Sequence, residues 1–421
     1  MSDWEDPLWV DNRAATKGAG THAFIVGTSY YPFLKDGKNY PPKFELSIDL
    51  KQVSIAATGA WKFANWLTGP EFSLNAKAPL ASIRLMLSPS EEERSAFPEL
   101  KTLAPKHCST ERENVRSALM AWKEDCQKNG NSVAIFYVSG HGVARSPLES
   151  YVLLQDFPKD KQPMDYTIDP RGCSAGMQGD TIARSQFYFV DACRDNLEEF
   201  QKFKWFGTPL RLDEEYEGQD ERIWSMYFST SPARKAYGAP GDGTFFSAAL
   251  MDCLKGPGPR ALFAPTDTAG LEEQKSNWNI SNHSLALSLK TRVDEIVAEY
   301  NKQELDAALA QGKTAKARKQ TVLPEGIFNP MLLSVWQQPP KLYIHIHVEP
   351  EDRAKIATAT LQDLRNTVIF QDKECVPRPL KFEGLSAVPY LLDIQTQPGG
   401  QHKGPFVLTP KLPGIEHKVE F

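Results

Sequence analysis

The stretch SVAIFYVSGHG, residues 132–142, decides the fold. Its run from Val133 to Val138 is continuously apolar, as expected for a strand that is buried on both faces of a parallel sheet. Four further stretches share this character and alternate along the chain with helical patterns. They are HAFIVGTSY (22–30), IRLMLS (83–88), QFYFVDAC (186–193) and IWSMYFSTS (223–231). The alternation predicts an α/β fold, a doubly wound and mostly parallel sheet with right-handed crossovers.

Amphipathic patterns between and after these strands predict the helices. Each pattern ends at or near residues that break helices, such as Gly69-Pro70 after the first and Asn129-Gly130 after the second. The expected helices are residues 46–67, 111–128, 243–254 and 283–302.

A change of pattern near residue 337 marks a second domain. The stretch QQPPK (337–341) indicates a linker, and LYIHIHVEP (342–350) then alternates apolar and polar residues, which is typical of a half-exposed antiparallel strand. Three short strand-like stretches follow between turn residues. We therefore predict an N-terminal extension over residues 1–20, an α/β domain over 21–336 and a small C-terminal all-β domain, sandwich-like, over 341–421.

Composition limits the classes of function. A formal net charge of −5 gives no support for nucleic-acid binding. No stretch approaches the roughly 18 apolar residues of a membrane span. The six cysteines form no CxxC pair, which argues against a zinc or thioredoxin-like site and fits a reducing compartment. The acidic N-terminus lacks an apolar signal core. We expect a cytoplasmic protein that binds neither nucleic acid nor membrane.

Reactive side chains follow two of the predicted strands. His141 lies between two glycines after one strand, and Cys193 ends another. Sites in open α/β sheets form at the carboxyl ends of strands, so adjacent strands would bring these residues face to face. An imidazole that takes the thiol proton turns cysteine into a nucleophile. The N–H groups of Gly142 and Cys193 are the expected oxyanion hole. A single histidine or cysteine at such a place is more often structural, and the paired placement of His141 and Cys193 favours a catalytic role.

The motifs that carry these residues resemble the caspase and metacaspase cysteine peptidases. The pattern YVSGHG lies about fifty residues before DACR, AFIVGTSYYP is similar to the first strand of the family, and YVLLQD (151–156) resembles a short strand between the two catalytic residues. Residues 226–254 resemble the small-subunit region of bacterial caspase-like proteins. The resemblance covers roughly residues 20–335. It implies a caspase-like fold, protein substrates, an acyl-enzyme on Cys193, His141 as general base and no cofactor.

The residues beside the two strand ends bear on specificity. Side chains two apart share a face of a strand, so Asp191 points with Cys193 and Ser139 with His141. A carboxylate there favours Arg or Lys before the cut, and the metacaspases that carry this acid resemble the chain in that respect. Gly59 stands where the resemblance would place a second pocket acid. Arg234 is the alternative pocket residue and would favour acidic residues. Cleavage after small residues, or a structural role for Asp191, also stays open.

The segment from Arg194 to Arg222 is long and highly charged, and it occupies the place of the activation loop in similar zymogens. We expect a cut there, by the protein itself, by an activating protease or under a regulatory partner, to change activity. Arg194 is expected to hold a loop by pairing with an acid. The candidate cleavage sites are Lys202, Lys204, Arg211 and Arg222.

Two further clusters could bind metals, and for both a solvated surface is the preferred interpretation. Asp213, Glu214, Glu215, Asp220 and Glu221 could bind calcium, and His345 and His347 share one strand face without a third ligand. We assign no metal site.

The alternative to an enzyme is a catalytically silent caspase-fold protein that acts by binding through its β domain. The intact His141 and Cys193 favour the enzyme. Family association further suggests a role in bacterial defence or regulated cell death.

Overall fold

The computed structural model describes residues 4–40, 50–179, 181–194, 206–213, 220–231, 236–239, 243–255, 278–326, 329–336, 342–354, 357–372, 380–385, 389–396, 401–408 and 414–421. Contacts divide the chain into two units. Unit 1 comprises Met1–Met251 and Ser281–Ser334, and unit 2 comprises Asp252–Ile280 and Val335–Phe421. This division follows contacts in space, so the domain boundaries expected from the sequence remain predictions.

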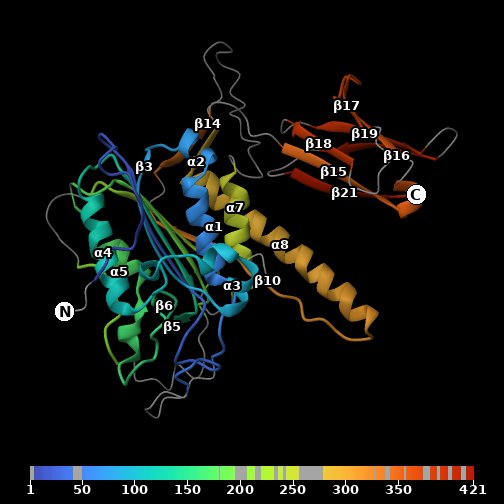
Figure 1. Ribbon diagram of the computed structural model, residues 1–421. Helices are drawn as coiled ribbons and strands as arrows, with labels where there is room; N and C mark the ends of the chain where they lie inside the picture. The colour runs from blue at the N-terminus through green and yellow to red at the C-terminus, as the bar shows by residue number, and fades with distance from the viewer. Residues whose placement is uncertain are drawn as a thin grey trace. The chain divides into compact units, whose positions relative to one another are not determined.

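A seven-stranded sheet forms the centre of unit 1 (Figure 1). Its strands are, in sheet order, β1 (Leu8–Asp11), β3 (Leu80–Ser88), β2 (Thr21–Thr28), β4 (Val133–Gly140), β8 (Ser185–Ala192), β9 (Ile223–Phe228) and β13 (Leu323–Gly326). The five inner strands are parallel, and the two edge strands run antiparallel to their neighbours. The predicted α/β fold with a mostly parallel sheet is confirmed.

Helices cover both faces of this sheet (Figure 1). One face carries α1 (Ala56–Thr68) and α7 (Phe245–Leu254), and the other carries α4 (Arg112–Cys126) and α5 (Pro170–Ala175). On the first face, Phe63 of α1 stacks on Tyr137 of β4 with ring centroids 4.9 Å apart. On the second, Trp122 of α4 packs against Phe24 of β2 at 5.9 Å. Burial of large aromatic rings on both faces explains why the strands are apolar throughout.

The remaining elements up to residue 336 are short, apart from one long helix. They are α2 (Pro70–Asn75), α3 (Glu91–Ala96), the 3₁₀ turns Pro98–Lys101, Pro105–His107 and Pro163–Tyr166, the small sheet of β5 (Gly142–Ala144), β6 (Ser150–Leu153) and β7 (Thr167–Ile168), the pair β10 (Gly238–Ala239) and β11 (Gly243–Thr244), the pair β12 (Trp278–Ser281) and β14 (Leu332–Trp336), and α8 (Asn282–Ala310). A reciprocal capping box between Ser281 and Ser284 starts α8.

Two predicted helices have wrong boundaries. The first was expected over residues 46–67 but begins at Ala56, and residues 41–49 lie outside the described part of the chain. Residues just before Ala56 make other hydrogen bonds, because Gln52 bonds the backbone of Tyr31 and Val53 N–H donates to the Ser29 carbonyl. The helix expected over 283–302 continues to Ala310, because strong helix formers follow it.

From residue 342 onward the described part of unit 2 is all-β, apart from the short helix α9 (Glu351–Ala354). One sheet has the order β18 (Leu380–Leu385), β15 (Leu342–Glu349), β21 (Gly414–Glu420), and the other has the order β17 (Val368–Asp372), β16 (Ala357–Gln362), β19 (Tyr390–Thr396), β20 (His402–Leu408). Both sheets contribute side chains to one core. Strand β15 buries every second residue, as its alternating sequence predicted.

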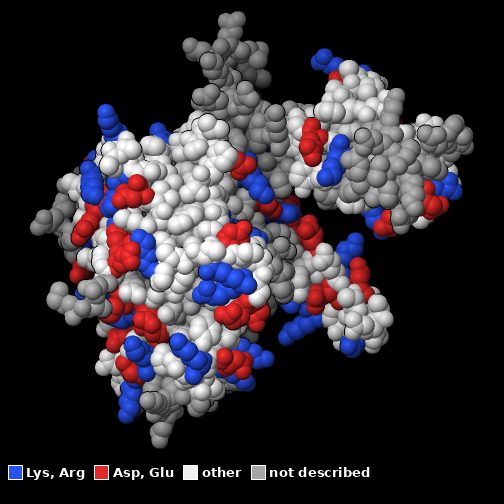
Figure 2. Space-filling model, viewed as in Figure 1, with Lys and Arg blue, Asp and Glu red and all other residues white. Residues whose placement is uncertain are grey.

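Charged residues of both signs are interspersed over the face shown in Figure 2. None of the helices that the structure describes combines the length and the apolar character needed to cross a membrane.

Candidate active site

The register of two central strands brings His141 and Cys193 together. Strands β4 and β8 are parallel neighbours, and Gly140 pairs with Ala192 at their carboxyl ends. His141 and Cys193 are the next residues along each strand, so they leave the sheet side by side. This is the arrangement that the two sequence motifs predicted.

Two contacts orient the His141 ring. Its Nε2 lies 2.7 Å from the carbonyl oxygen of Lys51, and its ring packs on Tyr31 with centroids 5.2 Å apart. The Tyr31 hydroxyl accepts a hydrogen bond of 2.8 Å from the backbone N–H of His141. A carbonyl can only accept, so Nε2 carries the proton and Nδ1 keeps its lone pair. Burial lowers the pKa of His141, opposed by the Lys51 carbonyl, and the imidazole is therefore neutral at pH 7.

The Cys193 thiol lies against the backbone of Ala236, a residue that comes much later in the chain. The N–H of Ala236 donates to Sγ at 3.2 Å, and Sγ lies 3.6 Å from the Ala236 carbonyl oxygen. The next residue, Tyr237, donates its N–H to Gln320 at 2.8 Å, and Gln320 in turn donates to the Ser229 carbonyl at 2.9 Å. An N–H directed at sulfur stabilises the thiolate, which is the nucleophilic form.

Gly142 packs directly on the backbone of the cysteine. A Cβ at this position would lie 2.0 Å from the Cys193 carbonyl oxygen and 2.8 Å from Cβ of Ala192. Only glycine allows so close an approach. The oxyanion hole that the N–H groups of Gly142 and Cys193 would form remains a prediction.

Asp191 is 1% exposed and lies two residues before Cys193, on the same face of the strand. Its Oδ2 accepts hydrogen bonds from the hydroxyls of Tyr137 (3.3 Å), Ser139 (3.4 Å) and Thr244 (2.5 Å). Its Oδ1 is buried and has no hydrogen-bond partner among the described residues. Burial raises the pKa of Asp191 to about 6, against the three hydroxyls, so the carboxyl is ionised at neutral pH.

The expected second acid is absent for a steric reason. Gly59 lies on α1 beside the same cluster of hydroxyls, and a Cβ there would lie 2.9 Å from both Cβ and Oγ of Ser247 and 3.2 Å from the Tyr137 hydroxyl. Ser247 therefore occupies the space that an acidic side chain at residue 59 would need. The hydroxyls of Thr244 and Ser247 belong to this region and were not found from the sequence, because Ser and Thr carry no distinctive signal there.

Arg194 lacks the acidic partner expected for it, among the residues that the structure describes. It is 1% exposed, its Nη2 donates to the Pro147 carbonyl, and its guanidinium lies 4.4 Å from the Phe228 ring centroid. Its Nε and Nη1 have no hydrogen-bond partner among those residues. Burial, together with the nearby Arg171, lowers the pKa of Arg194 to about 10.

The remaining predicted residues of the activation segment and pocket are described only in part. Lys202, Lys204 and Arg234 lie outside the described residues. Arg211 is exposed, but its stretch is docked on β7, where Leu210 exchanges two backbone hydrogen bonds of 2.8 Å with Thr167 and Asp169. Arg222 is 8% exposed and paired with Asp220 at 3.0 Å, so a protease could not reach it without local unfolding.

The candidate metal ligands do not converge. Asp220 pairs with Arg222, and Glu221 lies 2.9 Å from Arg184. His345 stacks on Tyr343 with ring centroids 4.2 Å apart. Among the residues that the structure describes, no group of three or more His, Cys, Asp or Glu side chains could hold a metal ion.

Comparisons with known proteins identify a family match and a related protein. A family model described as the caspase domain matches residues 97–320, just over half of the chain. The uncharacterized protein y4kE of Sinorhizobium fredii (strain NBRC 101917 / NGR234) is 24% identical over 311 residues, which cover 73% of this chain and 80% of that protein.

Two solved structures show distant similarity. Caspase-1 from Spodoptera frugiperda has a TM-score of 0.40 at 11% identity, covering 74% of this chain and 87% of its own. Protein GSU0716 from Geobacter sulfurreducens has a TM-score of 0.39 at 11% identity, covering 75% and 97% respectively.

Proposed function

The chain belongs to the caspase family, and from this premise we propose that it is a cysteine endopeptidase that cleaves protein substrates after Arg or Lys. The observation that supports the proposal is the β4–β8 register, in which His141 and Cys193 each follow one residue of the pair Gly140–Ala192, together with the contact of His141 Nε2 with the Lys51 carbonyl. Membership of the family supports cysteine-peptidase chemistry in general. The dyad, the specificity and the control of this particular chain are our proposals.

The chemistry needs His141 to accept and then donate a proton in each of two steps, acylation and deacylation. Nδ1 takes the thiol proton as Cys193 attacks the substrate carbonyl carbon, and the N–H groups of Gly142 and Cys193 stabilise the oxyanion. The protonated ring then gives that proton to the leaving amine, which departs and leaves a thioester on Cys193. Water, deprotonated by Nδ1, hydrolyses the thioester and restores the thiol. No cofactor takes part in these steps.

Asp191 supports a preference for Arg or Lys. Its Oδ2 is engaged by three hydroxyls, whereas Oδ1 is buried and has no hydrogen-bond partner among the described residues. An unpaired buried carboxylate is costly unless a ligand compensates it, and a cationic substrate side chain would do so. An acidic residue before the cut would meet a like charge in the same place.

Control by cleavage of the segment from Arg194 to Arg222 remains part of the proposal. Arg222 is too buried to be an early site, so among the described candidates we favour Arg211. Because its stretch is hydrogen-bonded to β7, the cut at Arg211 requires that stretch to detach. An Arg211→Gln variant should mature more slowly if this site is used, as shown by gel analysis over time.

Location and biological role are inferred more indirectly. The five described cysteines form no disulfide with one another, which supports a reducing compartment such as the cytoplasm. A role in bacterial defence or regulated cell death rests on family association alone. Fractionation of cells that produce the tagged chain, followed by a survival assay with the Cys193→Ala variant, would test both.

The decisive experiment is a fluorogenic peptide panel that varies only the residue before the cut. The wild type, Cys193→Ala and Asp191→Asn would each be tested before and after limited proteolysis of the activation segment. Cleavage after Arg and Lys that is lost in Cys193→Ala and reduced about a hundredfold in Asp191→Asn is the expected result. Cleavage only after acidic or small residues would overturn the specificity. A biological effect kept in full by Cys193→Ala would favour the silent binding protein.

A further inference from the structure

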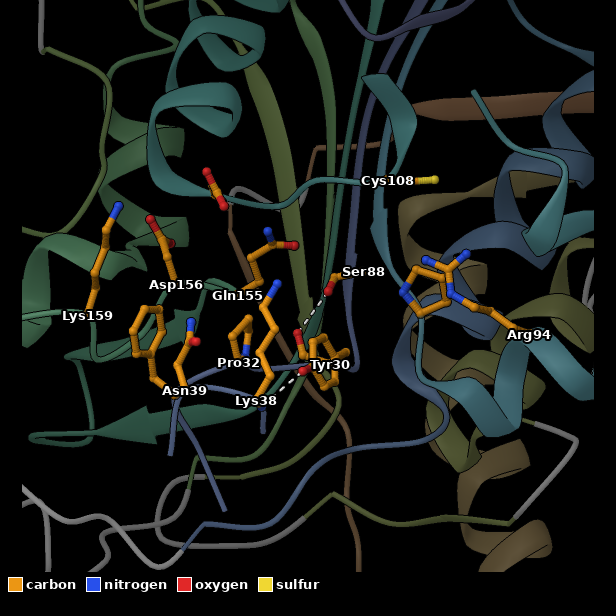
Figure 3. A pocket seen from close by; sticks show the side chains of 13 residues that line it. Tyr30, Pro32, Lys38, Asn39, Ser88, Arg94, Cys108, Gln155, Asp156 and Lys159 are labelled. Carbon is orange, nitrogen blue, oxygen red and sulfur yellow. Dashed lines mark hydrogen bonds between the residues drawn. The ribbon is translucent and has the colours of Figure 1, made fainter. Parts of the chain in front are cut away.

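A pocket of about 380 Å³ opens at the carboxyl ends of β2 and β3 (Figure 3). It lies at the same edge of the sheet as His141 and Cys193, displaced toward β1. Tyr30 lines it, and the next residue, Tyr31, packs on the His141 ring. The order β3-β2-β4-β8 therefore places the dyad between this pocket on one side and the segment at Ala236 on the other.

The direction of catalysis says which part of a substrate would face the pocket. His141 must give its proton to the leaving amine, so the residues after the cut lie on the His141 side of the cysteine. The residue before the cut lies on the Asp191 side, toward α1 and α7. A chain crossing the edge of the sheet in this sense runs from Asp191 past the dyad toward β2 and β3. At about 3.3–3.6 Å per extended residue, the pocket is within reach of the first few residues after the cut.

Cationic side chains line the pocket from three separate segments of the chain. Lys38 follows β2, Arg94 lies on α3 and Lys159 follows β6 (Figure 3). Lys38 and Lys159 form no ion pair with any of the residues that the structure describes. Arg94 is half-buried; its Nη1 donates a long hydrogen bond of 3.4 Å to the Leu100 carbonyl, and its Nε lies 3.9 Å from Glu91, a carboxylate that is 91% exposed. Such a distant and solvated pair leaves the guanidinium available to another anion.

The acids of the pocket neutralise these cations only in part. Both oxygens of Asp156 accept the backbone N–H of Arg112 at 3.2 Å, which caps the start of α4. Burial raises the pKa of Asp156 to about 6, with the Arg112 N–H acting against it. Glu111 is exposed at the rim. Three cations thus face two carboxylates, Asp156 and Glu111, so the lining keeps one net positive charge, and Tyr30 and Pro32 supply an uncharged wall for the stem of a side chain.

We propose that this pocket, lined by Lys38, Arg94 and Lys159, binds an acidic side chain of the substrate on the leaving-group side of the cut. The proposal rests on the proposed peptidase function and extends it to a second position of the substrate. A substrate with a basic residue before the cut and an acidic residue shortly after it would match both charged sites. Proteins that carry only the basic residue would be cut more slowly.

Internally quenched peptides with Arg before the cut test the pocket. Glu, Gln or Lys would be placed in turn at each of the first four positions after the cut. We expect Glu at one of these positions to raise kcat/KM about three- to fivefold over Gln, the size expected for one exposed charged contact. The Lys38→Gln/Lys159→Gln double variant should reduce that ratio to less than twofold. Lys161→Gln, an exposed lysine outside the pocket, is the matched control and should leave the ratio unchanged.

A binding measurement separates failure of the pocket from failure of the proposed function. Four peptides with a free amino terminus, each with Glu at one of those positions, and their Gln counterparts would be titrated into full-length Cys193→Ala. Tighter binding of one Glu peptide, lost in the double variant, supports the pocket even if no peptide is cleaved. Cleavage after Arg with no preference at any of the four positions overturns the pocket and leaves the peptidase standing. Equal binding of all Glu and Gln peptides also overturns it.

Discussion

Unit 1 buries charged side chains in two regions, and it treats them in opposite ways. Near the β1 edge of the sheet, Arg84 of β3 is 1% exposed and is paired with Asp125 at 2.7 Å and with Asp6 at 2.9 Å. At the carboxyl edge, Asp191 and Arg194 are equally buried, yet neither forms an ion pair among the described residues. We call the first set the Arg84 cluster and the second the unpaired site.

The pKa values follow from this difference. Burial acts to raise the pKa of Asp125, but hydrogen bonds from Lys128 and Arg84 outweigh it and lower the pKa to about 2. The pKa of Asp191 rises to about 6, because hydroxyl groups offset burial only in part. A buried charge with partners serves the fold, whereas a buried charge without partners costs stability and is retained where a ligand can complete it.

Breaking the Arg84 cluster should have the largest effect on stability. Arg84→Met removes a buried guanidinium from between Asp125 and Asp6, while Lys128 and Arg13 still contact Asp125, and we expect the free energy of unfolding to fall by about 3–4 kcal/mol. Denaturant titration followed by tryptophan fluorescence measures the change. Arg116→Met, which removes a guanidinium that is 61% exposed on α4, is the control and should change stability by less than about 0.5 kcal/mol. A loss of similar size in both variants would contradict the comparison.

Removing the charge of Asp191 should raise the free energy of unfolding, whereas breaking the Arg84 cluster should lower it. The native-state pKa of about 6 lies above the ordinary value of 3.8, so ionisation of Asp191 disfavours folding above pH 6. Asp191→Asn should therefore be more stable than the wild type at pH 8, by at most about 3 kcal/mol, while it loses cleavage after Arg. The advantage should shrink as the pH falls through 6 and vanish below about 4. A variant less stable than the wild type at pH 8 would show that the carboxylate is structural.

Activity should report the same titration. Only ionised Asp191 attracts a cationic side chain, so kcat/KM for a peptide with Arg before the cut should fall about tenfold per pH unit below pH 6. A peptide with Gln at that position does not use the charge. Its profile should follow only the protonation of His141, whose pKa is lowered by burial. Identical profiles for the two peptides would remove Asp191 from the pocket.

The smallest effect is expected at Arg194. Arg194→Met removes a buried charge whose Nε and Nη1 have no partner among the described residues, and it keeps a side chain of similar length over Phe228. The free energy of unfolding should change by no more than about 1 kcal/mol, well below the change for Arg84→Met. Parallel denaturant titrations of the two variants make the test. A loss of several kcal/mol would mean that Arg194 is compensated as fully as Arg84.

The sequence predicted the parts of the fold that depend on continuous burial. Strands β2, β3, β4, β8 and β9 were found because both of their faces are covered and their residues are apolar throughout. The edge strands were missed. Strand β13 reads LPEG, with Pro and Gly residues that disfavour a strand, and it forms because it completes the edge beside β9. The resemblance to the caspase family is confirmed by the family match.

Site residues were predictable where the side chain itself carries the chemistry. His141, Cys193 and Asp191 were chosen from their places at strand ends, and their roles in the site stay predictions. The groups that hold them were not, because Lys51 acts through its carbonyl and Ala236 through its N–H and carbonyl, and any residue has these groups. Only the tertiary structure brings such backbone groups to the site. The acid expected to pair with Arg194 is a related case: the sequence suggested a side-chain partner, and the described residues provide none.

The parallel pairing of β8 with β9 has a consequence for any cut between Cys193 and Ile223. The two strands are joined over six residue pairs, from Ser185–Ile223 to Val190–Phe228, and β8 is also held by β4. A severed chain would thus remain one particle in solution while migrating as two bands on a denaturing gel. The cleavage would be irreversible, although the two fragments would not dissociate. The fraction of cleaved chains, measured on a denaturing gel, would therefore record how many molecules had been activated, even after the activating signal had ended.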